Sequence, residues 1–155
     1  MKLKSDIRYA IRIIFTLTGL NKPASIAWLS EKTGIAQRAV ELIHSVLRQN
    51  GLTMSAVGSK GGIKLAVPLA EITLGKLVEI FDGGVEFFIC SGKKTNECPD
   101  KQKCAMRSVW NGLSDRIQLK LNSISLEEIF QDYVEKPSET TRKAACIAKQ
   151  DSSAN

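Results

Sequence analysis

Three of the four cysteines lie close together in the chain. Cys90, Cys98 and Cys104 fall within fifteen residues of one another, whereas Cys146 stands forty-two residues beyond the last of them. Thiolates are the usual ligands of iron–sulfur clusters and of zinc, because soft sulfur matches these metals. In a reducing compartment such clustered cysteines bind metal or do redox chemistry more often than they form structural disulfides. The three clustered cysteines therefore predict a metal or redox site, and we interpret Cys146 as a bystander.

The spacing of these cysteines bears on the kind of metal. Seven residues separate Cys90 from Cys98, and five separate Cys98 from Cys104. Structural zinc sites favour pairs of cysteines about two to four residues apart, and the pattern contains no such pair. Three thiolates also leave one coordination position for another ligand. The spacing therefore favours an iron–sulfur cluster, while zinc binding and a thiol switch without metal remain alternatives.

The elements that must position this site are helices and one hairpin. Apolar side chains recur at helical spacing over 5–20, 26–33, 36–50, 73–82, 105–122 and 125–135. Segments 52–57 and 63–67 alternate like strands, and the glycine-rich stretch 58–62 between them is typical of a hairpin tip. Residues suited to start or stop the helices stand at their predicted ends: Ser25, Gly34, Thr73, Gly83, Gly84 and Ser125, the last with Glu128 as a capping box.

The order of these elements predicts the fold class. Three helices followed by two strands are the order of a winged helix-turn-helix, so we expect a mainly α protein with a small β-hairpin wing and a long dimerisation helix. Residues 1–83 form the predicted DNA-binding head, and residues 84–104 the cysteine segment. Residues 105–135 hold the dimerisation helix and a C-terminal helix, and the polar stretch 136–155 is predicted to be a disordered tail.

The helix predicted at 36–50 is the candidate DNA reader. Helix-turn-helix proteins place the second helix of the pair in the major groove, with its N-terminal residues at the base edges. Gln37, Arg38 and Glu41 suit adenine, guanine and cytosine respectively. The candidate phosphate contacts come from lysines outside this helix, namely Lys60 at the hairpin tip and Lys2 and Lys4 at the N-terminus.

The helix predicted at 105–122 is the candidate dimer contact. Its apolar stripe is more than a small head can cover, and a symmetric pair of chains would bury it by isologous contact. The stripe consists of Met106, Val109, Trp110, Leu113, Ile117 and Leu121. The single histidine, His44, is interpreted as structural, at the surface or half-buried.

Composition and charge bear on the ligand, the location and the class of the protein. The formal net charge of +6 favours an anionic partner such as double-stranded DNA. No apolar run approaches the roughly 18 residues of a membrane span, and the N-terminal segment, broken by Arg8 and Arg12, is not a secretory signal. We therefore expect a cytoplasmic protein without membrane contact. One histidine and the lack of any catalytic constellation predict that it is not an enzyme.

Several short stretches, in order, resemble the IscR/NsrR-type family of bacterial regulators over residues 1–135. They are the opening Met1-Lys2-Leu3, the step Arg8-Tyr9-Ala10, Leu29-Ser30-Glu31 before Gly34-Ile35, the run Leu47-Arg48-Gln49-Asn50-Gly51-Leu52, the Gly-Gly wing, Ile72-Thr73-Leu74-Gly75, and the three cysteines ahead of Trp110 and Leu113-Ser114-Asp115-Arg116.

The resemblance implies a homodimeric iron–sulfur transcription regulator. It implies that Cys90, Cys98 and Cys104 hold the cluster, that the long helix joins the dimer, and that cluster state tunes binding to a pseudo-palindromic promoter site. The signal would be iron–sulfur status, redox state or nitric oxide. By similarity, Gln37, Arg38 and Glu41 are the base-reading residues.

The chain departs from this family at several positions. Its gap between the first two cysteines is longer than usual. The IscR branch takes its fourth ligand from a histidine where this chain has Arg107, and the NsrR branch from a partner's aspartate where this chain has Arg8, near Asp6. The sequence therefore predicts a cluster without distinguishing a two-iron from a four-iron type. Val57 replaces a common wing arginine, which leaves that contact to Lys60.

Two rival functions remain. One is a DNA regulator that uses zinc or a thiol switch on the same cysteines. The other is a small redox or cluster-carrier protein whose helix-turn-helix binds only protein. The metal content would separate the first from a cluster regulator, and a DNA-binding assay would separate the second.

Overall fold

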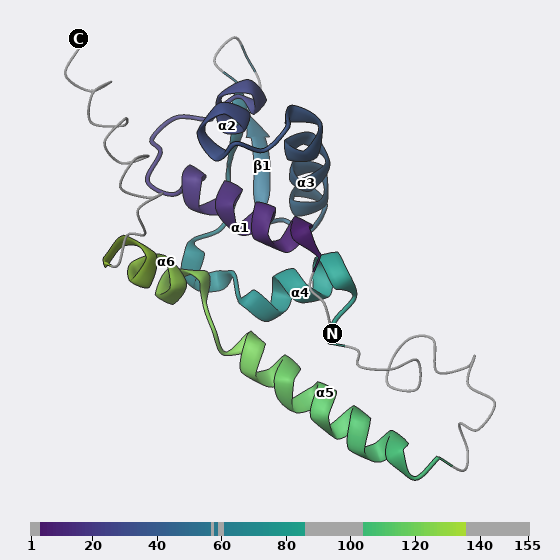
Figure 1. The fold of residues 1–155 in the computed structure, drawn as a ribbon. Coiled ribbons are helices and arrows are strands. Elements are labelled where there is room, and N and C mark those ends of the chain that lie inside the picture. The colour runs from purple at the N-terminus through teal and green to yellow at the C-terminus, as the bar shows by residue number, and fades with distance from the viewer. Residues whose placement is uncertain (1–3, 57, 59–60, 86–103, 136–155) are drawn as a thin grey trace.

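The chain forms a helical head from which one long helix projects (Figure 1). The computed structural model describes residues 4–56, 58, 61–85 and 104–135. The elements run in the order α1 (Ser5–Leu17), α2 (Ile26–Thr33), α3 (Gln37–Gln49), β1 (Thr53–Ala56), β2 (Gly62–Leu65), the 3-10 helix η1 (Leu69–Glu71), α4 (Leu74–Asp82), α5 (Met106–Asn122) and α6 (Leu126–Glu135). The predicted fold class, mainly α with a small β-hairpin, is confirmed.

Local capping signals explain where several of these helices begin and end. The Ser25 hydroxyl accepts from the Trp28 backbone N–H, and the Thr73 hydroxyl accepts from that of Lys76. Gly34 and Gly83 close α2 and α4 in the left-handed conformation, with φ of 67° and 82°. These ends match the predicted ones, because each depends on residues within one turn of the helix.

The end of α1 was predicted wrongly. The helix stops at Leu17 instead of continuing to residue 20, and Thr18 already has extended backbone angles. Gly19 follows with a φ of +79°, which glycine adopts at low cost and which breaks the helix. The expected stop at Asn21-Lys22-Pro23 therefore comes too late, because the glycine acts first.

The hairpin is antiparallel, and Thr53 pairs with Leu65 while Ala56 pairs with Gly62. Both strands are shorter than predicted, at four residues each. Ala24, before α2, joins the edge of β2: its N–H donates to the Ile63 carbonyl, and the Ile63 N–H donates back to Ala24. The hairpin is thus tied to the start of the helix-turn-helix.

One hydrophobic core lies between α1, α3, α4 and the hairpin. Ile13 and Ile14 of α1, Leu47 of α3 and Leu77 of α4 are all fully buried. Burial of such aliphatic side chains stabilises by about 1.5–3 kcal/mol each. The apolar residues on the buried side of α3 are Val40, Ile43 and Leu47.

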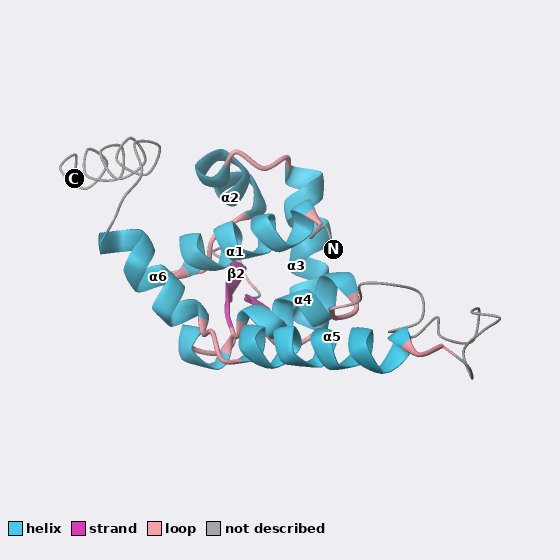
Figure 2. Cartoon of the chain, turned by 60° about the horizontal axis from the view of Figure 1, so that its bottom comes forward, coloured by secondary structure: helices cyan, strands magenta, loops and turns pink. Residues whose placement is uncertain are grey.

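The C-terminal helix α6 returns to this core, although the predicted domain division grouped it with α5. Leu126 is fully buried, and its N–H donates to the Ile72 carbonyl. Phe130 packs edge-on against Phe15 of α1, with ring centroids 5.1 Å apart. Helix α5 lies beneath α4, and its N-terminal end extends beyond the head in both ribbon views (Figures 1 and 2).

Within the described ranges, we find no helix with the length and apolar character needed to cross a bilayer.

Candidate functional site

The turn between α2 and α3 is fixed by short polar contacts. The Ser30 hydroxyl donates to the Ile35 carbonyl at 2.7 Å, and the Thr33 hydroxyl donates to the Leu29 carbonyl at 2.6 Å. From α1, the Arg12 guanidinium donates to the Thr33 carbonyl at 3.0 Å, where a cation suits the carbonyl end of α2. These contacts set the angle at which α3 leaves the turn.

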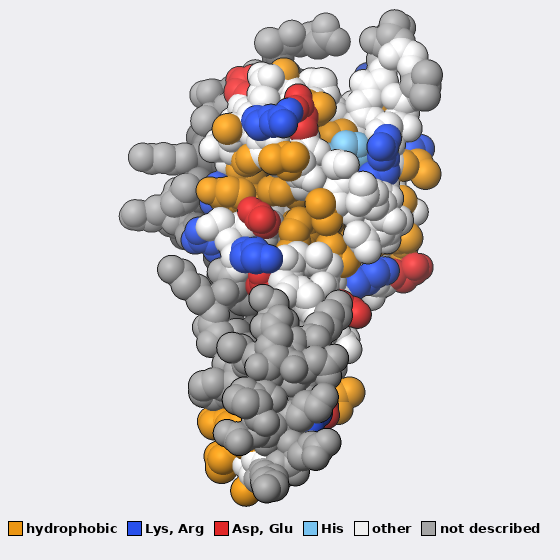
Figure 3. Space-filling view, turned by 90° about the vertical axis from the view of Figure 1, so that its right-hand side faces the viewer, with side chains coloured by type: hydrophobic (Ala, Val, Ile, Leu, Met, Phe, Trp, Pro, Cys, Tyr) orange, Lys and Arg blue, Asp and Glu red, His pale blue; other side chains and the backbone are white. Residues whose placement is uncertain are grey.

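Helix α3 presents a polar face opposite its buried stripe. Gln37, Arg38 and Glu41 are all exposed at its N-terminal end. Arg38 and Glu41 form an ion pair at 3.8 Å, in which the side chain of Arg38 is 82% exposed. An ion pair this exposed contributes little to stability and leaves both groups available to a ligand. Figure 3 looks onto the α3 side of the molecule and shows hydrophobic side chains exposed among charged ones.

His44 connects the back of α3 to the first strand of the hairpin. Its Nδ1 lies 3.0 Å from the Thr53 hydroxyl, and its Nε2 lies 3.1 Å from the Ser55 hydroxyl. Burial, and secondly the nearby charge of Arg48, lower the pKa of His44 below 6.5. Both ring nitrogens thus have hydroxyl partners on β1. The histidine holds the wing strand against the helix that carries the candidate base readers.

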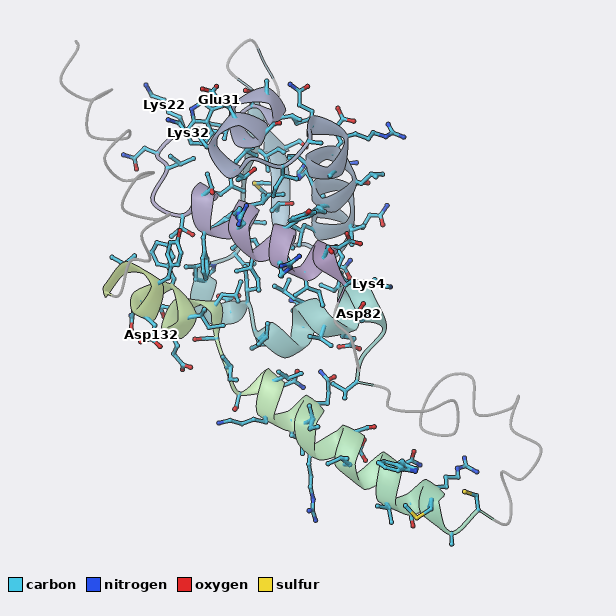
Figure 4. All side chains as sticks on the ribbon, in the orientation of Figure 1. Lys4, Lys22, Glu31, Lys32, Asp82 and Asp132 are labelled. Atoms are coloured by element: carbon cyan, nitrogen blue, oxygen red, sulfur yellow. The ribbon has the colours of Figure 1, made fainter. Side chains whose placement is uncertain are left out.

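Lys4, predicted as a phosphate contact, lies at the carbonyl end of α4 (Figure 4). Its ammonium group donates to the Phe81 carbonyl at 2.8 Å and lies 3.5 Å from an Asp82 carboxylate oxygen. The Lys4 backbone N–H also donates to Asp82, at 3.3 Å. These contacts join the start of α1 to the end of α4. The other predicted lysines, Lys2 and Lys60, lie outside the described residues, as does Val57.

Of the three predicted ligand cysteines, the structure describes one. Cys104 is partly buried, forms no disulfide with any described residue, and stands two residues before α5. Cys90 and Cys98 lie outside the described ranges, and so does Cys146 in the segment 136–155. Among the residues the structure does describe, no three His, Cys, Asp or Glu side chains gather as a metal site.

The predicted apolar stripe of α5 divides into two parts. Ile117 and Leu121, near the C-terminal end, pack against the core of the head. Toward the N-terminal end Met106, Val109 and Leu113 are 49%, 54% and 39% exposed. Trp110 between them is partly buried. The single chain therefore covers the C-terminal part of the stripe and leaves the part near Cys104 largely open.

A polar seam joins α5 to α4. It consists of Ser114, Gln118 and Asn122, spaced by four residues on α5, and of Gly75 on α4. The Gln118 amide donates to the Gly75 carbonyl at 3.3 Å and to Asn122 Oδ1 at 3.1 Å. A Cβ atom on Gly75 would collide with the Asn122 side chain and backbone, so this close approach requires glycine. Ser114 Oγ and Gln118 Oε1 are buried without a hydrogen-bond partner in the described part of the chain.

Comparison with known proteins places this arrangement in a family. A family model named Rrf2, described as an iron-dependent transcriptional regulator, matches residues 3–132. The chain belongs to the Rrf2 family. The HTH-type transcriptional regulator IscR of Cronobacter sakazakii is 34% identical over 131 residues, which cover 83% of this chain and 80% of that protein. IscR of Photorhabdus laumondii is 35% identical over the same length, covering 83% and 79% of the two chains.

Solved structures confirm the fold of this Rrf2 family member. IscR of T. potens superposes with a TM-score of 0.67 at 24% identity, covering 89% of this chain and 92% of that one. CymR, the global cysteine regulator of B. subtilis, gives 0.66 at 23% identity, with coverages of 84% and 97%. The predicted family is confirmed, and the chain is a transcriptional regulator of the Rrf2 type, a class that binds DNA.

Sequence reasoning about this Rrf2 family member missed two features. The role of His44 depends on the hydroxyl groups of Thr53 and Ser55, which lie on strand β1. The periodicity of helix α3 does not indicate these two partners. Leu42, 56% exposed on α3, is not among the predicted base readers, because these were predicted from side chains that hydrogen-bond to base edges. Its position two residues after the buried Val40 could have indicated its exposure.

Proposed function

We propose that this Rrf2 family member binds a pseudo-palindromic promoter site as a homodimer, and that an iron–sulfur cluster held by Cys90, Cys98 and Cys104 tunes its affinity for DNA. The family model described as an iron-dependent transcriptional regulator, which covers residues 3–132, carries this proposal. The curated IscR relatives at 34–35% identity support it.

The geometry of the head supports DNA as the ligand. Helix α3 stands after a turn held by Arg12, Ser30 and Thr33, and its N-terminal Gln37, Arg38 and Glu41 face solvent. These side-chain types read base edges in the major groove. In the proposed complex Arg38 leaves its weak pair with Glu41 to meet a guanine. Lys60 and Lys2 supply phosphate contacts, while Lys4 supports the head through its pair with Asp82.

The donor chemistry of the three cysteines fits an iron–sulfur cluster. Cys104 is partly exposed and forms no disulfide with a described residue, so its thiolate is available as a ligand. When bound, the cluster supplies a redox- and iron-sensitive centre. Cys104 lies two residues before α5, so a change at its thiolate would act on the N-terminal end of that helix. The open side chains of Met106, Val109 and Leu113 at this end are the proposed dimer contact.

A thiol switch on the same cysteines is the second candidate. The fold is shared with S. aureus CymR, which has been solved in an oxidized form, with a TM-score of 0.61 at 23% identity. In this candidate the cysteines change oxidation state without a metal, and the DNA-binding head works in the same way. Zinc bound by the three thiolates is a separate alternative, in which the cysteines hold a metal without an iron–sulfur cluster.

One preparation separates these candidates. The protein is purified without oxygen, its visible absorption is recorded, and iron, sulfide and zinc are measured per chain. We expect a brown protein that contains iron and sulfide and that shifts a promoter duplex with an affinity that changes when the chromophore is bleached. A colourless protein with stoichiometric zinc, or with neither metal, would exclude the cluster. Loss of DNA binding under every condition would exclude the regulator.

A further inference from the structure

Leu42 lies in the middle of the outward face of α3. The buried face of this helix consists of Val40, Ile43, His44 and Leu47. Residues three and four apart share a helix face, so Leu42 shares its face with Arg38 and Ala39 before it and with Ser45 and Val46 after it. Of these four neighbours only Arg38 is exposed, and the other three are half-buried. Leu42 itself is 56% exposed.

The other exposed side chains of α3 are polar. They are Gln37, Arg38, Glu41, Arg48 and Gln49, so Leu42 is the one apolar member of this set. Contiguous apolar patches larger than a few hundred square ångströms mark sites where another protein docks. On α3 only Leu42 exposes a large apolar side chain, and the exposed Arg38 and Glu41 adjoin it. This arrangement matches a surface that offers small apolar groups among polar ones.

The major groove of DNA is such a surface. Among the base edges exposed there, thymine carries an apolar group, its C5-methyl, beside the acceptors and donors of the other bases. Base-reading side chains on a recognition helix recur at spacings of three, four and seven residues, and positions 38, 41, 42 and 45 of α3 have this spacing.

We propose that Leu42 is a specificity-determining residue that reads thymine by contact with its C5-methyl group. The inference rests on the proposed DNA binding through α3. Four residues of helix rise about 6 Å, while successive base pairs are about 3.4 Å apart. The thymine read by Leu42 therefore lies one or two base pairs from the guanine read by Arg38.

Replacement of thymine by uracil tests this contact, because it removes the methyl group alone. A duplex that binds the full-length protein is first selected from a random DNA library, and the base read by Arg38 is located with Arg38→Ala. Each dT in the duplex is then replaced by dU in turn. We expect the wild type to lose affinity about three- to tenfold at one thymine per half-site, within two base pairs of that located base.

Two variants make the test specific. Leu42→Ala should bind the dT and dU duplexes equally at that position, because the variant lacks the side chain that contacts the methyl group. Leu119→Ala, a leucine on α5 that is 69% exposed, should keep the full wild-type discrimination. Leu42 is exposed, so its removal leaves the core intact.

The outcomes separate this inference from the function on which it rests. Insensitivity of the wild type to every dU replacement, or full retention of the sensitivity in Leu42→Ala, would overturn the reading of thymine while leaving DNA binding in place. A selected site without thymine within two base pairs of the Arg38 base would overturn it as well. If the library enriches no duplex, the proposed function fails, and the inference fails with it.

Discussion

The Nδ1 atom of His44 lies 3.0 Å from the Oγ1 atom of Thr53, across the boundary between helix α3 and the hairpin. Thr53 is 2% exposed and His44 is 8% exposed, so this contact is shielded from water. It is a direct polar connection between the two parts of the head that would contact DNA together.

Titration of His44 should occur below its ordinary range. Burial, and secondly the charge of Arg48, lower its pKa below 6.5. His44 is the only histidine, so its ring protons can be followed by NMR. Arg48→Ala should raise the midpoint but leave it below 6.5, because burial is the larger cause. The exposed Arg116 of α5 is the matched control and should leave the midpoint unchanged on replacement by alanine. A wild-type midpoint at or above 6.5 would contradict the geometry.

The same shift makes stability depend on pH. Between the lowered folded pKa and about 6.5, the unfolded chain binds the proton more strongly than the folded protein does. The free energy of unfolding should therefore be unaffected by His44 above pH 6.5 and should fall as pH drops through this window. The slope for one proton cannot exceed about 1.4 kcal/mol per pH unit. His44→Gln, which does not titrate, should lack this slope in urea unfolding at pH 7.5 and 5.5.

Thr53→Val should destabilise the head. The valine keeps the shape of threonine but leaves His44 Nδ1 buried without its hydroxyl partner, at a cost of about 1–3 kcal/mol. Ser55→Ala removes the other partner, but Ser55 is exposed and water can replace its hydroxyl, so its cost should be below about 0.5 kcal/mol. Urea unfolding at pH 7.5 measures both. Equal free energies of unfolding for the two variants would show that the buried contact of His44 with Thr53 stabilises the head no more than the exposed one with Ser55.

Cysteine variants should separate ligands from the bystander. Serine at position 90, 98 or 104 removes a thiolate ligand, so each of Cys90→Ser, Cys98→Ser and Cys104→Ser should abolish or cripple the visible chromophore of the anaerobically purified protein. Cys146→Ser is the control and should keep the full absorption and iron content. A chromophore that survives all three replacements would place the cluster elsewhere.

Leu113→Asp should weaken dimerisation and, with it, DNA binding. Leu113 lies on the open part of the α5 stripe, and a carboxylate there would be buried against the second copy. Leu119→Asp places the same charge on the same helix, at a site 69% exposed and off the stripe, and should leave association unchanged. Light scattering at tens of micromolar gives the mass. A monomeric wild type at that concentration would be inconsistent with the proposed dimer.

Arg38→Ala and Lys60→Ala should impair DNA binding in different ways. Loss of a bidentate guanine contact costs about 1–3 kcal/mol on the preferred site and flattens the preference at one base pair per half-site. Loss of a phosphate contact weakens all sequences about equally and reduces the salt slope by about one per contact. Titrations over salt on matched and scrambled duplexes distinguish the two. If Arg38→Ala binds both duplexes as the wild type does, α3 is not the reader.

Most of the fold followed from signals that act within one helical turn. Two helices begin at Ser25 and Thr73 and end at Gly34 and Gly83, and each of these residues acts on backbone groups within one turn of the helix. The ends of these helices could therefore be predicted. The end of α1 was predicted wrongly, because Gly19, with its positive φ, follows the helix before the expected stop at Pro23 is reached. Local signals also predicted the hairpin, although not the bridge from Ala24 to Ile63 that extends it.

The roles of individual polar residues were harder to predict because they depend on partners far along the chain. Lys4 was predicted to contact a phosphate, and the structure gives it a further partner, Asp82, that is seventy-eight residues away and that no local pattern indicates. The partners of His44 are nine and eleven residues away and belong to a strand whose register had first to be known. The α5 stripe was predictable as apolar, but only the packed head shows which part of it a single chain covers.

The polar seam bears on how α5 is attached to the head. Hydrogen bonds such as those of Gln118 contribute only about 0.5–1.5 kcal/mol each, since water replaces them when they break. Ser114 Oγ and Gln118 Oε1, which find no partner among the described residues, would gain one from water that entered the gap. Water can therefore enter the seam at low cost. The seam adds little to the attachment of α5, and the apolar side chains of Ile117 and Leu121, which pack against the core, hold the helix to the head.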